Sequence, residues 1–280
     1  MAPAPSGKPA ARRPTGQIVF AHANGFPAGV YGSLFDVWRD AGYAVHAIEK
    51  IGHDAAWPVT SNWPHLRDQL IAFIETEVVG PAWLVGHSLG GLLSVLVASK
   101  RPDLARGVVL LDAPILAGWR AHGLQVVKAT GLIRRVSPGR VSQRRRQAWP
   151  SRAAVREHFA KKAAFVRWDP RVLEDYVKCG FVRRGGQTVL AFDRAVETRI
   201  YNTLPHHMAR VLRRHPLGCP LAFIGGQQSV ESRQAGVEAT RRLAGERFVW
   251  TPGTHLFPME HPDATAAWVL VLLARIDAGA

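Results

Sequence analysis

The sequence Gly86-His87-Ser88-Leu89-Gly90-Gly91 lies between an apolar run at residues 83–85 and a helix-like run at 92–98. A serine flanked by glycines at such a junction predicts a sharp turn from a strand into a helix. The turn strains the backbone of the serine, so the positions two residues away must lack bulky side chains. The first N–H groups of the helix point at the serine and can stabilise a negative oxygen there. Ser88 is therefore a candidate nucleophile, and the N–H of Leu89 is a candidate oxyanion donor.

Around this turn, short apolar runs alternate with helix-like segments. The runs are bounded by Gly, Pro or charged residues, as buried parallel strands tend to be. A helical spacing of apolar residues over 63–74 predicts one covering helix, with Ser61 or Asn62 as its cap and Pro64 in its first turn. A run from Pro262 predicts a second. The pattern predicts an α/β fold with a doubly wound, mostly parallel sheet. We expect its six strands at residues 17–21, 44–49, 82–86, 107–111, 220–225 and 247–250.

Residues 114–216 break this alternation, because the segment is long, rich in arginine and rich in aromatic side chains. Long connections in compact domains usually have structure of their own and often cover an active site. We therefore expect a flexible tail at 1–16, a core at 17–113 and 217–280, and an inserted helical cap at 114–216.

A serine hydroxyl is a weak nucleophile at neutral pH, so it needs a base, normally histidine. His255 is the best candidate, because it lies in the loop between the last strand and the last helix. His261 directly precedes Pro262 and is better placed to help start that helix, whereas His206 and His207 fall in the cap segment.

The base in turn needs a carboxylate to orient it. The fourth predicted strand ends in Leu111-Asp112-Ala113-Pro114, whereas the fifth is followed by no carboxylate before Glu231. Asp112 is therefore the preferred acid and Glu231 the alternative. An Asp before Ala-Pro can also simply close a turn at a strand end.

A second oxyanion donor is expected from the loop after the first strand, His22-Ala23-Asn24-Gly25-Phe26-Pro27. The backbone N–H of Phe26 or Asn24 would supply it, with the Asn24 side chain as a further option.

With Ser88, Asp112 and His255 in this order, the sequence resembles the α/β-hydrolase superfamily from residue 17 to 276, in its serine hydrolase branch with a helical cap. The resemblance implies a serine hydrolase that cleaves small-molecule carboxylic esters through an acyl-enzyme. In one respect the chain departs from the common pattern, in which the acid follows the strand matched here by 220–225. Many haloalkane dehalogenases carry the acid one strand earlier, but they use an aspartate nucleophile, so Ser88 disfavours dehalogenation.

Two other functions share the expected scaffold. An acyltransferase or a hydrolase of carbon–carbon bonds would use the same three residues with a different acceptor or substrate. A non-catalytic binding protein would instead use the basic cap to dock an anionic partner.

Composition narrows the remaining choices. The 280 residues are 47% hydrophobic and 20% charged, with a net charge of +15, which is typical of a globular chain with a basic surface. No nucleic-acid module accompanies the arginines, so we do not expect nucleic acid as a partner. No metal-ligand spacing, phosphate loop or dinucleotide fingerprint occurs, so we expect no metal and no cofactor. Two cysteines, no apolar leader and no membrane-length run predict a cytoplasmic protein without a membrane span.

Overall fold

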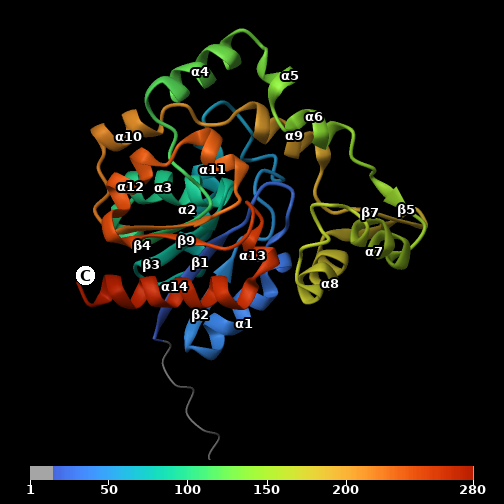
Figure 1. Cartoon of the computed structure of the whole chain (residues 1–280), viewed down its shortest axis with the longest axis horizontal. Coiled ribbons are helices and arrows are strands. Elements are labelled where there is room, and N and C mark those ends of the chain that lie inside the picture. The colour runs from blue at the N-terminus through green and yellow to red at the C-terminus, as the bar shows by residue number, and fades with distance from the viewer. Residues whose placement is uncertain (1–14, 280) are drawn as a thin grey trace, which may run out of the picture.

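The core of the protein is a parallel sheet of six strands in the order β2-β1-β3-β4-β8-β9 (Figure 1). The computed structural model describes residues 15–279. Each strand begins and ends within two residues of the range predicted from the sequence, which confirms the doubly wound α/β fold. The predicted tail lies outside the described residues except for its last two positions. The strands are β1 (Gly16–Ala21), β2 (Tyr43–Ala47), β3 (Ala82–His87), β4 (Ala105–Leu111), β8 (Leu221–Gly226) and β9 (Phe248–Thr251).

Both faces of this sheet are buried. Successive side chains of a strand point to opposite faces, so Val19 and Leu84 join one apolar cluster while Phe20 and Val85 join the other. Figure 1 shows the helices of the first face above the sheet and those of the second below it. The first face is covered by α2 (Pro64–Glu77), α3 (Leu89–Lys100) and α12 (Glu238–Ala244), and the second by α1 (Gly32–Asp40) and α14 (Pro262–Asp277).

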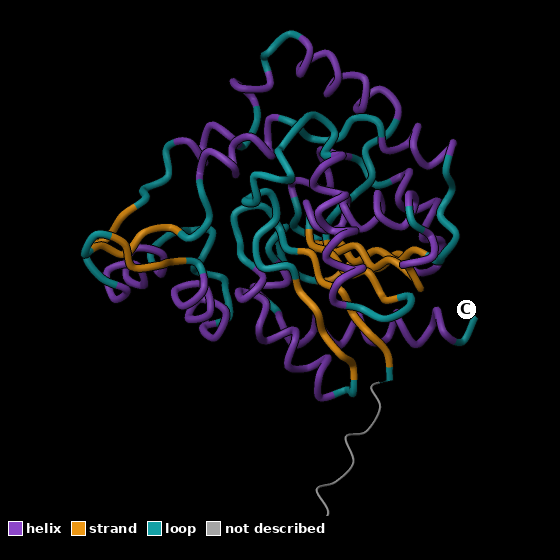
Figure 2. Tube along the Cα trace, turned by 180° about the vertical axis from the view of Figure 1, so that it is seen from behind, coloured by secondary structure: helices purple, strands orange, loops and turns teal. Residues whose placement is uncertain are grey.

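The segment between β4 and β8 forms a separate lobe that contains strands as well as the expected helices. Its three short strands pair in antiparallel fashion in the order β5-β7-β6. Figures 1 and 2 show this small sheet on the side of the molecule away from the end of α14. The lobe consists of α4 (Gly118–Ala129), α5 (Ile133–Val136), α6 (Gly139–Gln143), β5 (Ala148–Trp149), α7 (Arg152–Ala160), α8 (Pro170–Cys179), β6 (Phe181–Arg184), β7 (Gln187–Leu190), α9 (Arg194–Asn202) and α10 (Met208–Arg214).

Aromatic side chains join one half of this lobe to the core. Trp149, Phe159 and Tyr176 are buried in the same apolar cluster as α1 and α14. The N–H of Asp169, which caps α8, donates to the carbonyl of Met259 at 2.9 Å. The half of the lobe that spans α7 and α8 is thus packed against the core.

The start of α2 differs from the expectation that Ser61 or Asn62 would cap it. Trp63 occupies the cap position with a φ of 60°, and no side chain caps the helix. The Asn62 side chain instead accepts a hydrogen bond from the N–H of His206 at 3.1 Å. The polar residue before the helix therefore binds the inserted lobe rather than its own helix.

The remaining elements are short connections in the core. Both cysteines, Cys179 and Cys219, are free thiols. Within residues 15–279, no helix is both long and apolar enough to cross a membrane. The connections are η1 (Ala28–Tyr31), η2 (Pro102–Leu104), α11 (Val230–Ala235), η3 (Gly245–Arg247) and α13 (Phe257–Glu260).

Candidate active site

Ser88 occupies the strained turn between β3 and α3. Its backbone has a φ of 52° and a ψ of −112°, a combination that non-glycine residues rarely adopt. A Cβ on Gly90 would lie 1.9 Å from the carbonyl oxygen of Ala21, and one on Gly86 would lie 2.3 Å from the carbonyl carbon of Gly90. Only glycine fits at either position, so the packing of the turn maintains the strain at Ser88.

The Ser88 side chain is half-buried, at the edge of the sheet where β3 and β4 end. The backbone N–H of Ser88 donates to the carbonyl of Leu111 at 3.0 Å. Ser88 therefore lies next to the end of β4, where Asp112 follows. Within residues 15–279, no hydrogen bond joins the Ser88 hydroxyl to His255. Leu89 is the first residue of α3, so its N–H is one of the free donors at the start of that helix.

Asp112 is a buried carboxylate that accepts hydrogen bonds from four donors. Its backbone also has a positive φ, 43°, directly after β4. The Nδ1–H of His255 donates to Oδ2 at 2.7 Å. The other donors come from the end of β8 and from α11 with its cap: the Gly226 N–H and the Ser232 hydroxyl each donate to Oδ1 at 2.9 Å, and the Ser229 hydroxyl donates to Oδ2. The segment after β8, which supplies Ser229 and Ser232 here, is the place where α/β-hydrolases commonly carry the acid itself.

Asp112 and His255 shift each other's pKa. Burial would raise the pKa of Asp112, but the hydrogen bond and charge of His255, with the bonds from Ser229 and Gly226, hold it below its usual value. Burial would lower the pKa of His255, but the hydrogen bond and charge of Asp112 raise it above its usual value. The arrangement thus favours an ionised carboxylate and a histidine that is a stronger base than usual.

The loop that carries His255 is fixed at several points. The Nε2–H of His87 donates to the His255 carbonyl at 2.9 Å, while Nδ1 of His255 is held by Asp112. The Thr254 N–H and hydroxyl donate to the buried Glu260 carboxylate at 2.9 Å and 2.7 Å. The His255 ring therefore has little freedom to turn away from Asp112.

A chain of hydrogen bonds links this loop to the loop after β1. The Tyr31 hydroxyl donates to Nδ1 of His87 at 2.8 Å and accepts from the Ala23 N–H at 3.2 Å. Burial lowers the pKa of His87 to about 3 and raises the pKa of Tyr31. Both groups stay neutral near pH 7, so the donor directions along the chain are fixed.

The loop after β1 is held by His22, whose Nε2 accepts from the Ile51 N–H and whose Nδ1–H donates to the Ala23 carbonyl, each at 2.8 Å. Burial lowers the pKa of His22 to about 4. Two expected oxyanion donors on this loop already have partners. The Phe26 N–H donates to the Ala23 carbonyl at 3.2 Å, and the Asn24 side chain donates to the Glu197 carbonyl at 2.9 Å.

An ion pair from the inserted lobe covers this loop. Arg145 donates to the carboxylate of Glu197 at 2.6 Å and to the hydroxyl of Tyr176 at 2.7 Å. A Cβ on Gly25 would lie 2.9 Å from Glu197 Oε1, and Gly25 has a φ of +85°. Gly25 therefore permits both the turn of the loop and the close approach of the ion pair.

The alternative acid and the alternative bases make no hydrogen bond to Asp112 or His255 among the described residues. Glu231 is exposed on α11 and acts on His255 through its charge, which raises the pKa of the histidine. His261 is exposed and precedes α14, as expected of a residue that starts the helix. His206 and His207 lie in the inserted lobe, and His206 contacts the Lys128 ammonium at 3.1 Å.

Several residues that support the site were not identified from the sequence. Ser229 and Ser232, which donate to Asp112, follow β8 in the sequence. Serines are common after strands, so their presence there did not indicate this role. His87 stands beside the serine in the turn itself. These residues are Tyr31, His87, Ser229, Ser232 and Glu260. Within the described part of the chain, no three His, Cys, Asp or Glu side chains are grouped so as to hold a metal ion.

Comparisons with known proteins agree with this architecture. A model of the alpha/beta hydrolase family matches residues 18–268. Monoglyceride lipase of Mus musculus is 29% identical over 141 residues, which cover 48% of this chain and 45% of the lipase. Esterase Rv0045c of Mycobacterium tuberculosis is 30% identical over 99 residues, which cover 34% of this chain and 32% of the esterase. Each match therefore spans less than half of the relative's length.

A solved structure resembles almost the whole chain. The crystal structure of E-2-(acetamidomethylene)succinate hydrolase superposes with a TM-score of 0.72 and 22% sequence identity. The superposition covers 92% of this chain and 91% of that chain. At this identity the likeness concerns the fold, which includes the lobe between β4 and β8.

Proposed function

This chain belongs to the alpha/beta hydrolase family, and we propose that it hydrolyses carboxylic esters with Ser88 as nucleophile, His255 as base and Asp112 as the acid that orients the base. The observation that carries the proposal is the 2.7 Å hydrogen bond from His255 Nδ1 to a carboxylate with three further donors. A surface carboxylate would not require such burial and saturation. Together with the strained backbone of Ser88, it supports a site organised for nucleophilic catalysis.

In the first half of the reaction, Ser88 Oγ attacks the ester carbonyl carbon and His255 Nε2 takes the hydroxyl proton. The carbonyl π electrons move to oxygen and form a tetrahedral oxyanion. When this intermediate collapses, the bond to the alcohol oxygen breaks and His255 returns the proton to it. An acyl group remains on Ser88, and the alcohol leaves.

In the second half, water attacks the acyl-enzyme and His255 again takes the proton. Collapse of the second tetrahedral intermediate breaks the bond to Ser88 Oγ, which recovers its proton from His255. The acid product leaves, and the enzyme returns to its starting state. Asp112 stays ionised throughout and stabilises the imidazolium that forms twice in each cycle.

The oxyanion is proposed to lie between the start of α3 and the loop after β1. The Leu89 N–H supplies one hydrogen bond, and the backbone N–H of Asn24 or Phe26 supplies the second. Because the Phe26 N–H already closes a turn with Ala23, Asn24 has the freer backbone donor on this loop. The Asn24 side chain is occupied by the Glu197 carbonyl, which supports a backbone role over a side-chain role.

The proposed substrate is a small-molecule ester with an apolar acyl or aryl group. Phe26, beside the proposed oxyanion site, packs against Trp168 and Tyr176 of the inserted lobe at centroid distances of 5.6 Å and 5.8 Å. Trp168 and Tyr176 are buried, and Phe26 is the partly exposed member of this cluster. An aromatic surface favours apolar ligand groups. Two relatives of the chain, a monoglyceride lipase and an esterase, also bear the names of enzymes that act on esters.

We also propose that residues 114–216 act as the cap of this site, on the core formed by 17–113 and 217–280. The contact of Asn24 with Glu197 and the contacts of Phe26 with Trp168 and Tyr176 support this role. Both bring the lobe over the loop next to Ser88.

The test is the turnover of short-chain p-nitrophenyl esters by the purified protein and by matched variants. Ser88→Ala and His255→Gln should each lower kcat by roughly 10³-fold or more, because nucleophile and base act as one unit. His261→Gln, a histidine outside the site, should retain activity. Unchanged turnover in Ser88→Ala would overturn the proposal.

A further inference from the structure

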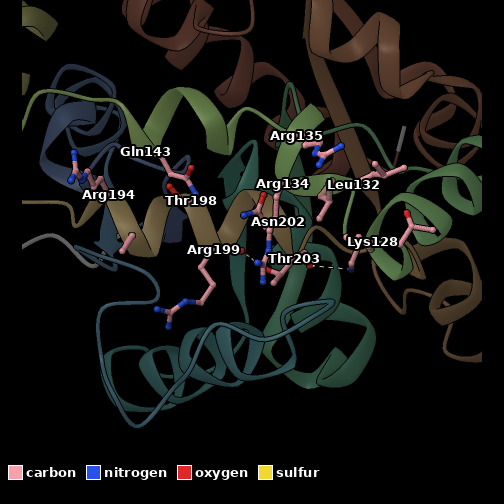
Figure 3. Close-up of a pocket in the computed structure, with 14 residues that line it drawn as sticks. Lys128, Leu132, Arg134, Arg135, Gln143, Arg194, Thr198, Arg199, Asn202 and Thr203 are labelled. Carbon is pink, nitrogen blue, oxygen red and sulfur yellow. Dashed lines mark hydrogen bonds between the residues drawn. The ribbon is translucent and has the colours of Figure 1, made fainter.

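The inserted lobe contains a cavity of about 920 Å³ between α4, α5 and α9, and none of the residues assigned to the proposed reaction lines it. Five cationic side chains and no acidic side chain line it. Figure 3 shows Arg134 beside Asn202 of α9, with Lys128 at one end of the cavity and Arg194 at the other. The cationic residues are Lys128, Arg134, Arg135, Arg194 and Arg199.

These cations lack the partners that neutralise other arginines of the protein. Arg101, Arg145 and Arg171, for example, pair with carboxylates. Among residues 15–279, no ion pair involves any of the five cavity cations, and no hydrogen bond engages the side chains of Arg134, Arg135 or Arg199. Their mutual repulsion is therefore not offset by an ion pair within the described chain.

Lys128 is held at its end of the cavity by neutral acceptors, among them Nδ1 of His206 at 3.1 Å. Its ammonium donates to the carbonyls of Leu204 and Thr203 at 2.6 Å and 3.3 Å (Figure 3 draws the second bond), and to Asn62 Oδ1 at 3.3 Å. Burial lowers the pKa of Lys128 to about 8. An anion in the cavity would offset this burial cost, because it favours the charged form.

From this lining we propose that the cavity binds a compact ligand with several phosphate-type negative charges. Guanidinium groups match phosphate oxygens in geometry and charge. Because the cations stand at both ends and in the middle, a ligand with more than one anionic group satisfies more of them than a single ion does. The cavity is partly open to solvent, so a ligand can enter it, and its volume of about 920 Å³ lies in the range of small-molecule sites.

Helix α9 lines the cavity and also contacts the loop after β1, beside Ser88. One face of α9 presents Thr198, Arg199 and Asn202 to the cavity. The other face presents Glu197, whose carbonyl accepts from Asn24. A ligand that draws on the arginines of α9 therefore acts on the same helix that contacts the proposed oxyanion loop.

The direct test is calorimetric titration of the full chain with inorganic pyrophosphate, a readout that does not depend on ester turnover. The wild type should bind one equivalent with saturation. Arg134→Gln with Arg135→Gln should raise the Kd at least tenfold, and Arg199→Gln alone should raise it several-fold. The matched control is Arg183→Gln with Arg184→Gln, an adjacent exposed pair on β6 outside the cavity, which should leave the Kd within twofold.

Equal weakening by both double variants would show attraction to the overall charge of +15 and would overturn the proposal, as would the absence of saturable binding. Arg134 and Arg135 are exposed, so both variants should fold, and their melting curves check this.

Two kinetic comparisons separate the sources of the phosphate. If a free phosphate compound occupies the cavity, pyrophosphate should change the turnover of a neutral ester in the wild type and not in the Arg134→Gln, Arg135→Gln variant. If the phosphate belongs to the substrate, a phosphate-bearing ester should have a lower KM than its neutral analogue, and the same variant should remove the difference. An unchanged response of both substrates to the cavity variant would contradict any link between the cavity and turnover.

Discussion

The surroundings of Asp112 and the cavity beside α9 differ in how their charged side chains are paired. Asp112 is an anion with four donors around it, including one from the loop of His255. The cavity gathers cations such as Arg134 and Arg199 that have no anion of the described chain as a partner. A carboxylate with four donors is held in one geometry, whereas a group of cations without anionic partners is free to bind an anionic ligand. The difference assigns internal organisation to the first region and binding to the second.

The largest effect is expected when the negative charge of Asp112 is removed. Asp112→Asn should lower kcat/KM by roughly 10³- to 10⁴-fold, because an amide no longer stabilises the imidazolium or fixes the Nδ1–H tautomer of His255. Since Asp112 raises the pKa of His255, the acidic limb of the pH profile should also move to lower pH. Glu231→Gln, the exposed alternative, is the control and should stay within a few-fold of wild type. A large loss in Glu231→Gln with little in Asp112→Asn would reverse the assignment.

The buried histidines of the site predict sensitivity to acid. Unfolded histidine titrates near pH 6.5, whereas burial lowers the pKa of His22 to about 4 and that of His87 to about 3. The unfolded chain therefore binds more protons between these values, so the free energy of unfolding falls as the pH drops below 6.5. At pH 5 each of the two rings should lower the free energy of unfolding by roughly 2 kcal/mol relative to neutral pH.

Urea unfolding at pH 7 and pH 5 measures the acid effect, and imidazole nitrogen chemical shifts identify its source. Both rings should remain neutral at pH 5 in the folded protein. Protonation of either ring at pH 5 without loss of stability would contradict the hydrogen-bond network assigned to them.

A smaller effect is expected from one donor to Asp112. Ser229→Ala leaves the carboxylate with three donors, and hydrogen bonds to charged groups contribute about 1.5–3 kcal/mol each. The free energy of unfolding at pH 7 should fall by about 2 kcal/mol. The pKa of Asp112 should rise, because the Ser229 bond lowers it. Denaturant unfolding of Ser229→Ala checks the first expectation, and a carboxylate titration by NMR checks the second. A variant as stable as wild type would show that the carboxylate is not dependent on saturation.

The smallest effect belongs to the cavity. Arg134→Gln should change the free energy of unfolding by no more than about 0.5 kcal/mol, because the side chain is exposed and makes no ion pair among residues 15–279. Thermal melting without added anion checks this. A destabilisation as large as that of Ser229→Ala would mean that Arg134 has a structural role, and the contrast between the two regions would fail.

The candidate site around Asp112 could be predicted from the sequence because the ends of neighbouring parallel strands lie together. In a parallel sheet, the residues after β1, β3, β4 and β9 meet at one edge, so Ser88, Asp112 and His255 could be selected by their places after predicted strands. The hydrogen bond of Asp112 with His255 joins two of the three residues. The donors from Ser229 and Ser232 escaped notice, because a hydroxyl after a strand gives no distinctive signal by itself.

The inserted lobe was less accessible to such reasoning. Its aromatic residues indicated a folded segment, but the β5-β7-β6 sheet consists of strands of two to four residues, too short to show a period. The cavity depends on how α4, α5 and α9 pack, and residues from Lys128 to Thr203 come together only in three dimensions. A scattered set of arginines in the sequence does not show which of them share a space.

The central claim is that Ser88 is an activated nucleophile, and labelling with a fluorophosphonate tests it without knowledge of the substrate. The purified full chain is treated with the reagent, digested, and mapped by mass spectrometry, with Ser88→Ala and His255→Gln as parallel samples. One adduct is expected, on Ser88, and it should be absent from Ser88→Ala and form much more slowly in His255→Gln. Folded wild-type protein that forms no adduct, or that is labelled on another residue at the same rate in all three samples, would contradict the central claim.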